Sequence, residues 1–151
     1  MSDLLEDVHA AAEWIAEALK YSGYNADFSP ASLWEVDRFF DEHSRNGDAV
    51  RGGLLSQDLG KRIFALGAYV GEVIRRDKGG EWHGDDNESM AEVNIELHVA
   101  DGSIGWPVQR VMKRFKNGEE DSIGVYGAGF GLDVGPRPER PPQKKPRWKF
   151  W

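Results

Sequence analysis

The residues best suited to chemistry lie in one short polar segment just past the middle of the chain. His83, Asp85, Asp86 and Glu88 fall close together in the sequence WHGDDNES. Clustered carboxylates bind hard cations and a histidine can add a nitrogen ligand, so this segment is the best metal candidate in the chain. Its spacing lacks the alternating ligands and the central glycine of a calcium loop. A solvated acidic loop is therefore favoured over a metal site, and we predict no metal or cofactor.

An alternating pattern follows this loop, with apolar residues at every second position of 91–100. Such alternation predicts a half-buried strand. Glu92, Glu96 and His98 fall on its outward face. The pair Asp101-Gly102 predicts a hairpin turn, with 103–106 as the returning strand. The loop and this outward face together form the predicted partner-binding set: Trp82, His83, Asp85, Asp86, Glu88, Glu92, Glu96 and His98.

Recognisable catalytic motifs are missing from the sequence. The glycines at 127, 129 and 131 lack the spacing and the βαβ context of a dinucleotide-binding turn. There is no Gly-x-Ser-x-Gly, no His-Glu-x-x-His and no cysteine, which excludes disulfides and thiolate chemistry. A triad assembled by the fold from distant residues stays open. We therefore predict a protein that is not an enzyme.

The C-terminal segment, RPERPPQKKPRWKFW, has the most unusual composition of the chain. It is rich in proline and charge, so we expect a disordered tail over 136–151. Its mixture of cations and aromatic rings suits nucleic acid, an anionic membrane surface, a partner protein or the acidic body of the chain itself. The residues predicted to bind are Lys144, Lys145, Arg147, Trp148, Lys149, Phe150 and Trp151.

The charge of the chain divides at the start of this tail. Residues 136–151 carry six basic side chains and one acidic one, a net charge of +5, which leaves −12 for residues 1–135 out of the total of −7. Such asymmetry indicates a charged partner. The N-terminus is acidic and amphipathic, unlike a signal peptide, and the longest nearly apolar run is nine residues, too short for a membrane span. We expect a soluble, cytoplasmic protein.

The length of 151 residues favours one domain, here 1–135, ahead of the tail. Apolar residues at spacings of three and four predict helices over 3–21 and, after Ser29-Pro30, to about residue 44. A helix over 57–76 has two apolar stripes, one of them interrupted by Gly60, Gly67 and Gly71. Those glycines indicate close approach of another element. Segments 119–135 are ambiguous between helix and strand.

Two groups of charged residues on the predicted helices are expected to lie at the protein surface. Glu72, with arginines at 75 and 76, has the spacing of a solvent-exposed ion pair. In the helix opened by Pro107, the cations Arg110, Lys113, Arg114 and Lys116 are expected to point outward as a basic face. The whole pattern predicts an α+β fold: a helical N-terminal half whose central buried helix packs on a small antiparallel sheet, followed by a disordered basic tail.

Residues 59–123 resemble a group of uncharacterised bacterial domains. The resemblance rests on LGAYVGEVIRRDKGGEW, on the strand after it, and on WPVQRVMKRFKNGEEDSI. Its shared pattern is a G-A-Y-x-G-E-V helix, a G-G-E-W turn and a proline-led helix ending in N-G-E-E-D. Some such small acidic proteins look like immunity proteins encoded beside bacterial toxins. The resemblance implies protein binding and transfers no residue roles.

Three functions follow as hypotheses. The first is an immunity or antitoxin-type inhibitor whose acidic body binds a basic toxin. The second is an adaptor anchored by the tail to nucleic acid, membrane or a larger assembly. The third is a metal-dependent hydrolase that uses His83 and the acidic loop.

Overall fold

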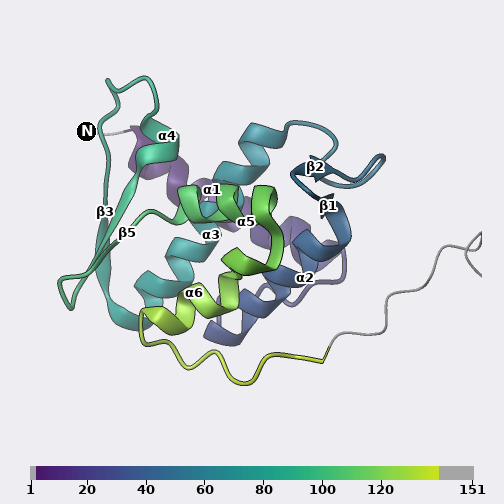
Figure 1. Ribbon diagram of the computed structural model, residues 1–151. Helices are drawn as coiled ribbons and strands as arrows, with labels where there is room; N and C mark the ends of the chain where they lie inside the picture. The colour runs from purple at the N-terminus through teal and green to yellow at the C-terminus, as the bar shows by residue number, and fades with distance from the viewer. Residues whose placement is uncertain (1–2, 140–151) are drawn as a thin grey trace, which may run out of the picture.

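The computed structural model describes residues 3–139 and has an α+β fold (Figure 1). The helices are α1 (Asp3–Tyr21), α2 (Leu33–His43), α3 (Leu59–Lys78), α4 (Ala91–Asn94), α5 (Pro107–Asn117) and α6 (Ile123–Gly129), with 3-10 turns η1 (Pro30–Ser32) and η2 (Gly118–Asp121). The strands are β1 (Ser44–Arg45), β2 (Asp48–Ala49), β3 (Gly80–His83), β4 (Glu96–Val99) and β5 (Ile104–Gly105). The predicted fold class is confirmed.

The strands form two small antiparallel sheets. One is the β1–β2 hairpin, where Asn46 and Gly47 have φ of 51° and 84° and make the two-residue turn that such a hairpin needs. The other has the order β3-β4-β5, with Trp82 opposite Leu97 and His98 opposite Ile104. Figure 1 shows this second sheet standing along one side of the helices.

The prediction of a strand over the whole of 91–100 is wrong in its first half. The amide of Asn94 donates to the carbonyl of Met90 and closes a helical turn, so the strand begins only at Glu96. The Asn94 side chain contacts Glu88 and Gln109, and these polar contacts hold the turn in place. A stretch of four residues is too short for its apolar pattern to distinguish a strand from a single helical turn.

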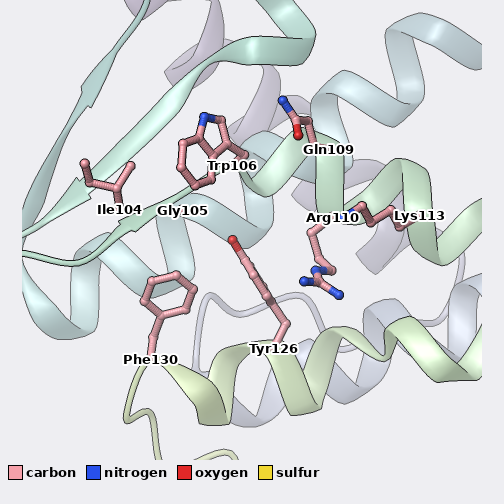
Figure 2. A pocket seen from close by; sticks show the side chains of 8 residues that line it. All are labelled: Ile104, Gly105, Trp106, Gln109, Arg110, Lys113, Tyr126 and Phe130. Carbon is pink, nitrogen blue, oxygen red and sulfur yellow. The ribbon is translucent and has the colours of Figure 1, made fainter.

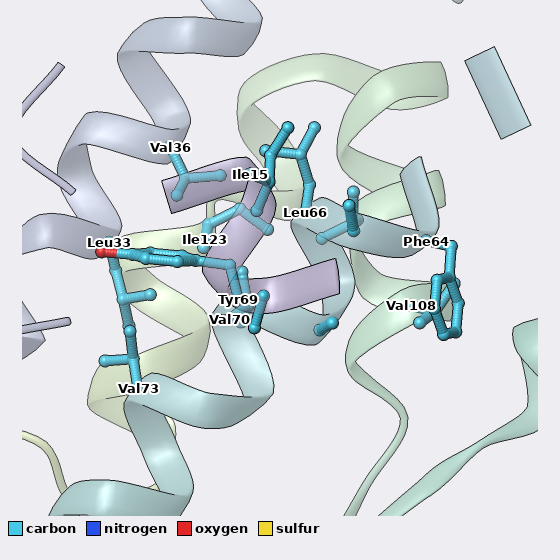
Figure 3. Close-up of a cluster of buried hydrophobic side chains, with 14 of the residues drawn as sticks. Ile15, Leu33, Val36, Phe64, Leu66, Tyr69, Val70, Val73, Val108 and Ile123 are labelled. Atoms are coloured by element: carbon cyan, nitrogen blue, oxygen red, sulfur yellow. The ribbon is translucent and has the colours of Figure 1, made fainter. Parts of the chain in front are cut away.

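The core is built around α3, which is buried from Ile63 to Ile74 (Figure 3). Helix α1 packs on it through Val8, Ala12, Ile15 and Leu19, as the apolar spacing predicts, and Leu4 is the buried residue of its first turn.

Two of the three helix glycines allow the close approach that the sequence indicates. A Cβ at Gly67 would lie 2.6 Å from Cα of Val108, and one at Gly71 would lie 2.0 Å from Cη2 of Trp82. Gly60 has no neighbour within 4 Å, so the same interpretation is wrong there.

The basic face predicted for α5 is interrupted at Arg114, which is 2% exposed. Its guanidinium donates to Oδ1 of Asp37 at 2.9 Å and to Asp41 at 2.7 Å. Position 114 lies three residues after the buried Val111 and next to Phe115, at the edge of the inward stripe. The carboxylate of a buried partner on α2 therefore draws this arginine inward.

The segment after α5, which the sequence left open between helix and strand, forms the helix α6, and Asp37 binds the start of this helix. Its carboxylate accepts hydrogen bonds from the amides of Ile123 at 2.8 Å and Gly124 at 2.9 Å, and from Oγ of Ser122 at 2.7 Å. The two amides are orphan donors at the start of α6, which have no intrahelical acceptor. A buried ion pair between α2 and α5 thus also fixes α6.

The chain that follows α6 packs against α2. Leu132 and Val134 belong to the same buried cluster as Leu4, and the indole of Trp34 donates to the carbonyl of Val134 at 2.9 Å. The binding residues predicted for the tail, 144–151, lie outside the described residues. Within 3–139, no helix has the length and apolar character needed to cross a membrane.

Candidate partner-binding site

The acidic end of the molecule combines two segments that contain neither lysine nor arginine. Residues 79–109 lack both and carry seven carboxylates: Glu81, Asp85, Asp86, Glu88, Glu92, Glu96 and Asp101. Residues 1–19 also lack both and carry five, among them the exposed Glu6 and Asp7. The two cation-free segments lie far apart in the sequence, so their relative placement depends on the fold.

The fold brings these two segments together. The amide of Leu4, at the start of α1, donates to Oδ1 of Asp86 at 3.2 Å. Gly84 packs so closely on this turn that a Cβ there would lie 2.5 Å from Cδ2 of Leu4. Figure 1 shows the loop after β3 and the short helix α4 beside the start of α1. A carboxylate at a helix N-terminus is also favoured by the helix dipole.

The loop between β3 and α4 is shaped by its own side chains. Oδ1 of Asp85 accepts from the amide of Asn87 at 2.9 Å, and Oε1 of Glu88 accepts from the amide group of Asn94 at 2.5 Å. Asp85, Glu88 and Glu92 are all exposed. Ordered, exposed carboxylates lose less entropy on binding than those of a flexible loop.

The outer face of the sheet continues this acidic surface. Glu81 and His83 on β3 lie on it with Glu96 and His98 on β4, while Trp82, Leu97 and Val99 turn to the core. The two imidazoles stack with 3.9 Å between ring centroids. Nε2 of His98 lies 2.7 Å from Glu96, and Nε2 of His83 lies 3.7 Å from Glu81.

Trp82 is not available as a contact residue, which corrects its predicted role. It is 6% exposed, its ring lies against Gly71, and its indole nitrogen donates to Oε2 of Glu72 at 2.9 Å. Trp82 therefore attaches β3 to α3 and positions the residues on either side of it, Glu81 and His83, at the surface.

Glu72 is buried, so its interpretation as part of a surface ion pair is wrong. It is 1% exposed and accepts from Arg75 at 2.6 and 2.9 Å, with Nδ1 of His9 at 3.2 Å. The spacing of Glu72 and Arg75 is the same for a buried and an exposed pair, and the elements that cover it, α1 and β3, are distant in sequence. No sequence signal identifies this burial.

A groove of about 570 Å³ opens beside this buried cluster, between α1 and β3. Leu5 and His9 come from α1 and Arg75 from α3, while β3 and the following Gly84 form the other wall. Arg75 and the adjacent Arg76 are paired with Glu72 and Glu13 respectively. Both arginines beside the groove are thus paired with carboxylates.

The environment of Glu72 lowers the pKa of its carboxyl to about 2. Burial acts to raise this pKa, but the hydrogen bonds from Arg75 and Trp82 and the charges of Arg75 and His9 outweigh it. The carboxylate form is therefore favoured by folding.

Glu72 should make stability fall in acid. Because its folded pKa is below its unfolded value of 4.5, its contribution is complete above pH 4.5 and is lost as the pH falls toward 2. Denaturant unfolding at pH 6, 4 and 3 measures this, with Glu72→Gln as the comparison, since glutamine does not titrate. We expect the stability of the wild-type protein to fall more steeply below pH 4.5; equal pH dependence of the two proteins would contradict the assignment.

The residues of the metal hypothesis do not converge. Between residues 3 and 139, no group of three or more histidine, aspartate or glutamate side chains is arranged to hold a metal ion. His83 stacks on His98, Asp86 contacts α1, and Glu88 contacts Asn94. Each of these side chains thus has its own partner.

Comparisons of the chain with family models, with curated proteins and with solved structures found no match. The resemblance to immunity-type bacterial domains therefore stays a prediction.

Proposed function

We propose that this protein is a binding protein of the immunity or antitoxin type, which acts in the cytoplasm by holding a basic partner protein against its acidic end. One observation carries the proposal: the two cation-free segments of the chain lie side by side, joined by the contact of Leu4 with Asp86. The contact surface comprises Asp85, Glu88 and Glu92 of the loop region and the outward residues of β3 and β4.

Physical chemistry supports this choice of partner. A surface lined by one sign of charge raises the rate at which an oppositely charged protein associates, and it rejects partners of the same sign. The groove between α1 and β3 adds apolar contact through Leu5, next to the exposed Glu81. An inhibitor needs fast and selective association of this kind, because it must bind its target before the target acts.

The test is to isolate the partner. The tagged full chain, expressed in its native host, is expected to co-purify with a basic protein at about 50 mM salt and to release it at about 500 mM, because salt screens exposed charges. Co-expression of the two genes is expected to restore growth that the partner alone inhibits. The absence of a basic protein from the purified complex, or a basic partner whose binding does not respond to salt, would overturn the proposal.

A further inference from the structure

A second hollow, of about 220 Å³, lies between β5, α5 and α6, and none of its lining residues belongs to the contact surface proposed above (Figure 2). Its walls are aromatic on two sides. Tyr126 of α6 and Phe130, the residue after that helix, form one side, with 5.1 Å between their ring centroids, and Trp106 forms the other. Gly105 leaves room for the rings of Tyr126 and Phe130, because a Cβ there would lie 2.7 Å from the hydroxyl of Tyr126 and 2.8 Å from Cζ of Phe130.

The mouth of this pocket is apolar and exposed. Trp106 is 41% exposed and Ile104 is 42% exposed, so two large apolar side chains of the lining face solvent together. Tryptophan, tyrosine and arginine are also the residue types that most often dominate binding energy at protein interfaces. All three line this pocket, as Trp106, Tyr126 and Arg110.

The charged side chains that line the pocket are basic, whereas residues 1–135 as a whole have a net charge of −12. Among the described residues that line it, the charged ones are Arg110 and Lys113, both on α5. The guanidinium of Arg110 lies 2.7 Å from Asp121 and 4.9 Å from the centroid of the Tyr126 ring, so it is held in place. Lys113 is exposed at the rim. A pocket with aromatic walls and a cationic rim complements an apolar group next to a negative charge.

We infer that this pocket binds an acidic peptide segment of a partner protein. One apolar or aromatic side chain enters between Trp106 and Tyr126, and the carboxylates beside it in the peptide contact Lys113 and Arg110. The volume of about 220 Å³ is below the roughly 300–1,000 Å³ of sites that enclose whole small molecules, which favours a single side chain. The pocket shares no residue with the contact surface proposed on the loop, β3 and β4, so the two proposals stand or fall separately.

Three blocked tripeptides that differ only in charge provide the probe: Glu-Phe-Glu, Gln-Phe-Gln and Lys-Phe-Lys. Each is titrated into the full chain labelled with 15N, and the backbone and indole N–H signals are followed by NMR. We expect Glu-Phe-Glu to shift the signals of Trp106 and of neighbouring residues on α5. Gln-Phe-Gln should bind several-fold more weakly and Lys-Phe-Lys should not bind. Equal shifts from all three peptides, or no shift at the pocket with millimolar Glu-Phe-Glu, would overturn the inference.

Two lysine variants on one helix separate the pocket from general electrostatics. Lys113→Gln should weaken Glu-Phe-Glu binding by about threefold, since it removes one rim charge. Lys116→Gln makes the same change in net charge at an exposed position of α5 outside the pocket, and it should leave the affinity unchanged. Equal weakening by both variants would contradict a site at this pocket. A second contradicting result would be self-association of the chain that displaces the peptide, which sedimentation velocity would detect.

Discussion

Replacing Asp37 by alanine should lower the free energy of unfolding by about 3–5 kcal/mol, the usual cost of removing one partner of a buried ion pair. The carboxylate lies 2.9 Å from the guanidinium of Arg114, which is itself buried. It also accepts from the first amides of α6 at 2.8 and 2.9 Å. The substitution therefore leaves the buried cation with the carboxylate of Asp41 and the backbone carbonyl of residue 37, and it leaves the start of a helix without its acceptor.

Urea unfolding measures this loss, and Asp48→Ala provides the control. Asp48 is an exposed aspartate on β2, and its replacement should change stability by less than about 0.5 kcal/mol. Amide hydrogen exchange adds a local readout, because the amides of Ile123 and Gly124 should lose protection in Asp37→Ala. A loss of stability below about 1 kcal/mol would show that Asp37 does not organise α2, α5 and α6.

Gly71→Ala should destabilise the protein by about 2–4 kcal/mol, the second large effect. The new Cβ would lie 2.0 Å from Cη2 and 2.3 Å from Cζ2 of Trp82, and 3.1 Å from Cγ of Pro107. The indole ring must therefore move, which breaks its hydrogen bond to the buried Glu72. Alanine gains up to about 1 kcal/mol in helix propensity, which is less than the cost of the clash and of the lost bond.

The matched control is Gly60→Ala in the same helix, where no atom lies within 4 Å of the added carbon. This variant should gain stability, by up to about 1 kcal/mol. Thermal unfolding of both variants gives the comparison, and the indole N–H signal of Trp82 in a 15N NMR spectrum reports whether its hydrogen bond to Glu72 is lost. Two shifts of the same sign would mean that Gly71 has no special packing role.

Local features of the sequence predicted most of the helices and the second hairpin. The spacing of apolar residues in α1 and α3, the proline at the start of α5 and the Asp101-Gly102 turn are all local signals, and the elements they predict are present. The strand predicted at 91–94 was wrong, because one helical turn is too short for its period to be recognised in the sequence. The tail predictions fall on residues outside those that the structure describes.

Burial of charged residues was the part that the sequence did not reveal. Glu72, Arg114 and Asp37 are each covered by elements distant in the chain, and their local spacing matches that of surface residues. The same reason applies to the groove, where His9 and Arg75 meet β3 only in the folded protein. The acidic loop, in contrast, was found from composition alone. Its contact with α1 through Asp86 required the structure.

The proposal that the acidic end binds a basic partner is tested most directly with three carboxylates of that surface. The variant Asp85→Asn, Glu88→Gln, Glu92→Gln removes their charge and keeps the oxygen atoms that accept from Asn87 and Asn94. The control Asp48→Asn, Asp58→Asn, Glu120→Gln makes the same change in net charge at exposed positions elsewhere.

The dissociation constant for the isolated partner is measured for both variants by calorimetry at several salt concentrations. The acidic-end variant should bind at least about tenfold more weakly and with a smaller salt dependence, while the control should stay within about twofold of wild type. Equal weakening by the two variants, or unchanged binding by the first, would contradict the proposed site.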